Sequence, residues 1–186
     1  MQNKLKAFGL IAVLLVGSLS QVGCGNTQSL DKVGRVAVAL AKGFSDEVAA
    51  LKAAGVTGRR IEAAERAARQ MTTAADSLNA ILQNAKNINE KDAAAVVGYA
   101  ATITATIGGL LQNPEFLGLG ESSLLVKVAR YSSVALNQLS LTLAIYFPPK
   151  PPGVGVASDG GRTVAVSKIK IEFPEPPAEV KVLIAK

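Results

Sequence analysis

The sequence predicts a mainly α-helical protein, an antiparallel four-helix bundle with a small C-terminal β-meander. Three observations predict this fold class. Apolar residues recur at three- and four-residue steps through residues 31–147, the spacing of a buried helix face. Turn-forming residues divide this region into four segments of helical length. From residue 148 the composition changes to prolines, glycines and alternating apolar residues, which is typical of turns and strands.

The first two predicted helices have the strongest apolar periodicity. In the first helix it extends from Val33 to Leu51, and Gly55 follows where a helix end favours a left-handed backbone. Thr57 is the expected cap of the second helix. The second helix alternates steps of three and four without a break, as coiled-coil surfaces do. We expect its core positions to be Ile61, Ala64, Ala68, Met71, Ala75, Leu78 and Leu82.

The opposite face of this second helix is charged. Glu62 precedes Arg66 by four residues, and Glu65 precedes Arg69 by the same step. Acid-before-base pairs at this spacing lie together on a helix surface. They are typical of a solvated face and indicate no catalytic pair of carboxylates.

The third predicted helix follows a turn at residues 87–92, in which Asn89 is the expected cap. It runs to about Gln112 and stops before Pro114, because proline ends helices. Four small residues at four-residue spacing form a line suited to close helix contact, in a membrane or in a soluble bundle. They are Ala94, Gly98, Thr102 and Thr106.

The fourth predicted helix runs from about Glu121 to Tyr146, and the prolines from Pro148 end it. Its apolar residues again recur at three- and four-residue steps, so we expect them to face the core. They are Leu124, Val128, Tyr131, Ala135, Leu139 and Leu143.

The C-terminal segment contains two alternating runs that predict strands. In residues 163–173, one predicted face carries Ile169, Ile171 and Phe173, and the other carries Lys168, Lys170 and Glu172. This alternation predicts a half-buried strand. Residues 180–184 alternate in the same way. A sheet this small needs a packing surface, which is either the helical body or a partner.

The N-terminus has the layout of a secretory leader. Residues 1–6 are basic, residues 7–16 form an apolar core, and small residues lead to Cys24, the only cysteine. This segment resembles the signal peptide and lipobox of bacterial lipoproteins. The resemblance implies cleavage before Cys24 and a diacylglyceryl group on its sulfur. The alternative is ordinary secretion, with a cut after Ser20 that leaves Cys24 as a free thiol.

These features divide the chain into four parts. Residues 1–23 are the expected signal peptide, residues 24–30 a lipidated tether, residues 31–147 the helical bundle, and residues 148–186 a Pro/Gly-rich segment with strands. One domain with a substantial core fits this length.

Composition argues against several functional classes. The 20 basic and 14 acidic residues are scattered, and the chain has no tryptophan, so we expect no nucleic-acid binding. Histidine is absent and the one cysteine is expected to be acylated, so we expect no metal or cofactor. Ser123 and Lys127 are the nearest pair to a nucleophile and base, but a serine at a helix start is typically a cap. We therefore expect no enzyme.

The sequence thus predicts a lipid-anchored cell-envelope protein that acts as a non-enzymatic structural or protein-interaction module. Its expected partners are the membrane, through the lipid anchor, and a protein of the envelope. It is expected on the periplasmic or extracellular side. The residues after Cys24 lack the aspartate that retains enteric lipoproteins at the inner membrane, which by that resemblance favours the outer membrane in a Gram-negative organism.

A second hypothesis is a membrane-inserting or channel-associated protein. Residues 93–112 and 131–149 contain no charged residue, and each stretch is about as long as a bilayer-spanning helix. Together they would form a helical hairpin. Extraction separates the two hypotheses, because an inserted hairpin still needs detergent after the lipid is removed.

Overall fold

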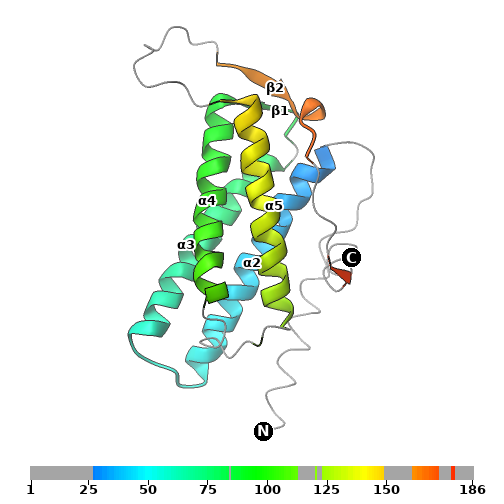
Figure 1. The fold of residues 1–186 in the computed structure, drawn as a ribbon. Coiled ribbons are helices and arrows are strands. Elements are labelled where there is room, and N and C mark those ends of the chain that lie inside the picture. The colour runs from blue at the N-terminus through cyan, green and yellow to red at the C-terminus, as the bar shows by residue number, and fades with distance from the viewer. Residues whose placement is uncertain are drawn as a thin grey trace.

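A computed structural model describes residues 27–83, 85–112, 120, 123–148, 161–171 and 177–178. It is mainly helical, with a small two-stranded antiparallel sheet (Figure 1), as the sequence predicts at this level. The elements in chain order are α2 (Thr27–Ala53), α3 (Arg59–Leu82), β1 (Asn87–Asn89), α4 (Glu90–Gln112), α5 (Leu124–Tyr146), β2 (Thr163–Ala165) and a 3-10 turn, η2 (Val166–Lys168).

Each helix packs on two others. α2 contacts α3, α3 contacts α4, α4 contacts α5, and α5 contacts α2 (Figure 1). α2 and α3 run in opposite directions and approach closely at Gly34, where a Cβ atom would lie 2.6 Å from Oδ1 of Asn79. Nearer the other end of this helix pair, the hydroxyls of Ser45 and Thr72 lie 3.3 Å apart.

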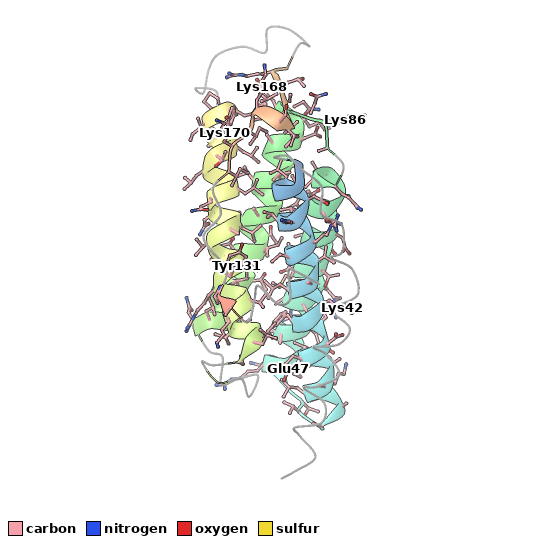
Figure 2. The ribbon with its side chains drawn as sticks, turned by 90° about the vertical axis from the view of Figure 1, so that its right-hand side faces the viewer. Lys42, Glu47, Lys86, Tyr131, Lys168 and Lys170 are labelled. Carbon is pink, nitrogen blue, oxygen red and sulfur yellow. The ribbon has the colours of Figure 1, made fainter. Side chains whose placement is uncertain are left out.

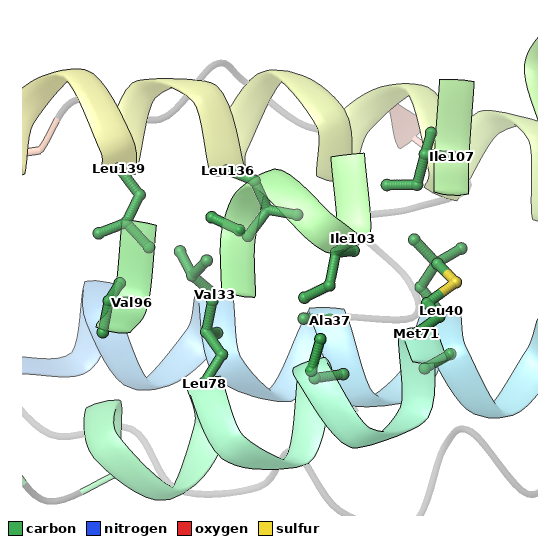
Figure 3. Close-up of a cluster of buried hydrophobic side chains, with 14 of the residues drawn as sticks. Val33, Ala37, Leu40, Met71, Leu78, Val96, Ile103, Ile107, Leu136 and Leu139 are labelled. Carbon is green, nitrogen blue, oxygen red and sulfur yellow. The ribbon is translucent and has the colours of Figure 1, made fainter. Parts of the chain in front are cut away.

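The core runs along the length of the four helices. Figure 3 shows part of it. All seven core positions predicted for the second helix, which is α3 in the structure, are buried. Met71 and Leu78 have no exposed surface. Val33, Ala37 and Leu40 meet them from α2. Val96, Ile103 and Ile107 of α4, with Leu136 and Leu139 of α5, belong to the same cluster and are labelled in Figure 3.

Three helix boundaries confirm local capping predictions. Gly55 has a φ of 84°, and the backbone N–H of Val56 donates to the carbonyl of Leu51, which closes the end of α2. Asn89 Oδ1 accepts from the backbone N–H of Asp92 at 2.8 Å. Ser123 Oγ accepts from the backbone N–H of Val126 at 3.3 Å, so this serine caps α5.

Other boundaries differ from the predictions. α2 begins at Thr27, inside the segment 24–30 expected to be a tether, and Leu30 is buried. The N-cap of α3 is Gly58, at a φ of 101°, and not Thr57. α5 starts at Leu124, three residues after the expected Glu121.

The buried face of α5 also differs from the prediction in its first turns. Leu124, Val128 and Tyr131 are only partly buried. The fully buried positions there are Val126, Ala129 and Ser132. The predicted positions Ala135, Leu139 and Leu143 are buried. Polar Ser132 at a core position breaks the apolar pattern, which explains why periodicity selects the wrong face in this part of the helix.

The predicted strand over residues 163–173 is shorter than expected. Only Thr163–Ala165 is a strand, and the 3-10 turn η2 follows it. Its partner is β1, inside the segment expected to be a turn, with Ile88 opposite Val164. The described sheet therefore joins the tail to the connection between α3 and α4 and is not a local meander. Phe173, Glu172 and the run 180–184 lie outside the described residues.

The tail nevertheless packs against the helical body. Val164, Val166 and Ile169 are buried, Ile171 is partly buried, and Lys168 and Lys170 are exposed. The Tyr146 hydroxyl at the end of α5 donates to the carbonyl of Lys168 at 2.7 Å. The predicted sides of residues 168–171 are thus confirmed, although the backbone there is not a strand.

Candidate protein-interaction face

The outward side of α4 is made of small, uncharged residues. Its core side holds larger aliphatic side chains, including Val96, Ile103 and Ile107. Between the first turn and residue 109, its exposed residues recur at helical spacing: Ala94, Gly98, Ala101, Thr102, Ala105 and Gly109. A Cβ atom added at Gly98 or Gly109 would meet no atom within 4 Å. Three of the four small residues that the sequence selects, Ala94, Gly98 and Thr102, are therefore exposed and do not form a helix contact within the described chain.

The hydroxyl groups on this side are already hydrogen bonded. Thr102 Oγ1 donates to the carbonyl of Gly98 at 3.1 Å, and Thr106 Oγ1 donates to the carbonyl of Thr102 at 3.0 Å. On α5, Ser140 Oγ donates to the carbonyl of Leu136 at 3.0 Å. A hydroxyl that bonds to its own helix needs less water than a free one. The surface is consequently less polar than its threonine and serine content suggests.

The outward side of α5 adds larger apolar side chains. Val134, Leu141 and Ile145 are 46%, 67% and 76% exposed. They share one side of the helix with Ala144 and with Asn137, the only polar residue among its exposed positions from residue 131 to the end of the helix. Because α4 and α5 pack side by side, their outward sides adjoin (Figure 1). We call the exposed residues of these two sides, 94–109 on α4 and 134–145 on α5, the apolar face.

In contrast to the apolar face, α2 and α3 carry many charged side chains. Lys52 at the end of α2 donates to Glu65 of α3 at 2.7 Å, and this hydrogen bond lowers the pKa of the Glu65 carboxyl. Arg69, the partner predicted from the sequence, acts on Glu65 only through its charge. The pair therefore stabilises the fold while Glu65 is ionised, and this contribution is lost as the pH falls through the lowered pKa. Burial raises the pKa of Glu47 on α2.

By contrast, residues 93–112 of α4 and residues 131–146 of α5 contain no charge. Tyr131, at the edge of this uncharged stretch, is half-buried, and burial raises the pKa of its phenol, so it stays neutral. Large apolar side chains grouped on an exposed surface mark sites of contact with proteins or membranes, whereas isolated ones do not. The apolar face is the candidate functional site.

The sequence also singles out Ser123, Lys127 and Cys24. Ser123 serves as a helix cap, and Lys127 is one turn further along α5. Cys24 lies outside the described residues. Within the described residues, no group of three or more acidic or cysteine side chains is placed to hold a metal ion.

The exposure of Leu141 and Ile145 was not predicted from the sequence. The sequence nevertheless contained a signal for them, because neither residue lies on the helix face that carries the core residues Ala135, Leu139 and Leu143. Large apolar residues on the polar side of a periodic helix are expected to be exposed.

Among the described residues, one helix, α4, is long and apolar enough to cross a membrane by length and composition alone. Buried positions make up 28% of its most apolar 18-residue stretch. A core helix of a soluble protein passes the same test, so this finding by itself is weak evidence for insertion.

In comparisons with known proteins, the chain matches no protein-family model, no curated protein and no solved structure.

Proposed function

We propose that this chain is a lipid-anchored cell-envelope protein, acylated at Cys24, that acts as a non-enzymatic module for binding another envelope protein. The observation that carries the proposal is the apolar face. α5, which carries the exposed Leu141 and Ile145, packs beside α4 with its small outward residues, while most charged side chains of the helices are on α2 and α3. The leader-like segment that precedes Cys24, the only cysteine, supports the envelope location.

In this proposal the four helices form an antiparallel four-helix bundle. The cyclic order of the helix contacts and the single shared core support this arrangement. A bundle of this kind has four outward sides, and α4 and α5 supply two neighbouring ones. The partner is then a protein with an apolar helical surface, because small residues allow close helix approach and leucine and isoleucine supply buried area.

The anchor is tested by Cys24→Ser. We expect the variant, with its leader removed, to move from the membrane fraction to the soluble fraction, because acyl chains supply the binding energy for membrane attachment. The measurement is fractionation of cells that make the wild type or the variant, with detection of the chain in each fraction. A variant that stays in the membrane and needs detergent for extraction would instead support the second hypothesis.

That second hypothesis is the membrane-inserting or channel-associated protein, with a hairpin made from residues 93–112 and 131–149. The composition of α4 favours it. Two observations favour the lipid-anchored module. One side of α5 contributes Leu136, Leu139 and Leu143 to the shared core, so insertion would have to expose the facing residues of α2 and α3. Asn137 is also exposed in the middle of α5, where a bilayer disfavours it.

The apolar face is tested by the double variant Leu141→Gln and Ile145→Gln in the acylated chain. Because both side chains are mostly exposed, we expect the melting temperature to stay close to that of the wild type. We expect the envelope proteins that co-purify with the wild-type chain to be lost from the variant. The matched control is Arg66→Gln and Arg69→Gln, two exposed positions on α3, which should retain the same partners. If both variants retain them, the partner binds elsewhere.

A further inference from the structure

One end of the molecule is fixed close to the membrane if Cys24 is acylated. Cys24 precedes Thr27, the first residue of α2, by three residues. Consecutive Cα atoms are about 3.8 Å apart, so the Cα atoms of Cys24 and Thr27 lie within about 11 Å of each other. The end of the body at which α2 begins therefore sits near the lipid surface. This step rests on the proposed function.

The same end carries the small sheet. The contact of Gly34 with Asn79 places the first turns of α2 beside the last turns of α3. β1 and the start of α4 follow α3 directly, and β2 pairs with β1. The Tyr146 hydroxyl at the end of α5 reaches the tail here as well. We call this part, residues 85–92 and 161–171 with the adjoining helix ends, the sheet end.

Exposed cations gather at the sheet end. Figure 2 shows Lys86, Lys168 and Lys170 at this end, far from Lys42 and Glu47. Lys91 in the first turn of α4 and Arg162 just before β2 are also exposed. The acids in the two segments among the described residues are Glu90 and Asp92, both in the first turn of α4. Five cations against two acids leave an excess of positive charge.

The backbone that carries these lysines is fixed by contacts with the body. The carbonyl of Lys86 accepts from the backbone N–H of Val166 at 2.9 Å. The carbonyl of Lys168 accepts from Tyr146, and Ile169, between the two tail lysines, is buried. Their side chains therefore project from a rigid surface. Less conformational entropy is lost on binding from such a surface than from a free tail.

We propose that the sheet end rests on the membrane and that its cations bind the phosphate groups of anionic lipids. A basic surface beside a lipid anchor adds a second attraction to that of the acyl chains. It also orients the body, because the anchor holds only one point of the chain. The helices then stand away from the surface and leave the apolar face open along its length to a protein partner.

Charge alone does not select this end. Arg59 and Arg60 at the start of α3 are exposed near the opposite end of the helices. The position of the anchor distinguishes the two ends. The two arginines consequently provide a matched control, with the same change in charge far from the sheet.

The test uses residues 24–186 with Cys24→Ser, which removes the lipid and keeps every described residue. We expect this chain to sediment with vesicles of phosphatidylglycerol and phosphatidylcholine, and not with phosphatidylcholine alone. The double variant Lys168→Gln and Lys170→Gln should bind the anionic vesicles roughly 25-fold more weakly, because each lysine contributes about fivefold. Arg59→Gln with Arg60→Gln should lose less than about threefold, and raised salt should abolish binding of the parent chain.

Two outcomes would overturn the inference. One is equal binding to neutral and anionic vesicles. The other is an equal loss for the arginine control, which would mean that net charge alone drives binding. Because the lipid is absent from this chain, both results are independent of whether Cys24 is acylated in cells.

Orientation is tested with the acylated chain on the same anionic vesicles. An amine-reactive reagent should modify Lys168 and Lys170 several-fold more slowly than in the chain free in solution. Lys42, which is exposed on the middle of α2, should react at the same rate in both states. Equal reactivity of the tail lysines in both states would show that the sheet end does not rest on the surface.

Discussion

Leu78→Ala is expected to lower the free energy of unfolding by about 2–5 kcal/mol, the range for leucine removed from a packed core. Leu78 has no exposed surface and lies among Val33 of α2 and Leu136 of α5 (Figure 3). The truncation removes contacts to more than one helix and leaves a cavity that rigid neighbours fill only in part. Chemical denaturation followed by circular dichroism measures the change.

The matched control is the same substitution at an exposed leucine. Leu141→Ala should change the free energy of unfolding by less than about 0.5 kcal/mol, because Leu141 is 67% exposed. A loss for Leu78→Ala within that small range would contradict the core assignment. A large loss for Leu141→Ala would contradict the placement of the apolar face on the surface.

The helices were the most predictable part of this protein, because their signal is local and repeated. In α3 every predicted core position is buried, since one apolar stripe faces one charged side. The signal failed where a single residue breaks the pattern, as buried Ser132 does in α5. It also failed at Thr57, because the chain uses the left-handed freedom of Gly58 in place of a side-chain cap.

The sheet could not be predicted in the same way. β1 has three residues, and two of them are asparagines, which are typical of turns. Its strand character comes from pairing with β2, more than 70 residues further along the chain. No local pattern contains such a pairing. Asn89 has both roles, as the last residue of β1 and as the cap of α4, and only the second can be read locally.

The apolar face was predictable only in part. The spacing of Ala94, Gly98 and Thr102 indicates that they share one side of a helix, but α4 is apolar or small on nearly every side. Periodicity therefore does not say which side faces the core. Packing determines which side of α4 is buried, since Val96, Ile103 and Ile107 fill the space between helices and the smaller residues do not.

Deletion of residues 148–186 is expected to lower the melting temperature of the remaining chain by roughly 6–12 °C. The deletion removes three buried side chains, Val164, Val166 and Ile169, and leaves Ile88 of β1 without its cross-strand neighbour. Each buried aliphatic side chain is worth about 1.5–3 kcal/mol, and the ordering of the tail offsets part of that gain. A net loss of about 3 kcal/mol corresponds to this shift for a chain of this size.

A pair of point variants separates this packing from any other effect of the deletion. Ile169→Ala should lower the free energy of unfolding by at least about 2 kcal/mol, a large share of that net loss, because the side chain is buried. Lys170→Ala, one residue further on and exposed, should change stability by less than about 0.5 kcal/mol. If the deletion and Ile169→Ala both leave the melting temperature unchanged while an envelope partner is lost, the tail recognises that partner and does not stabilise the body. The partner would then bind by adding a strand to an edge of the sheet, since both strands are short and the described sheet has only two strands.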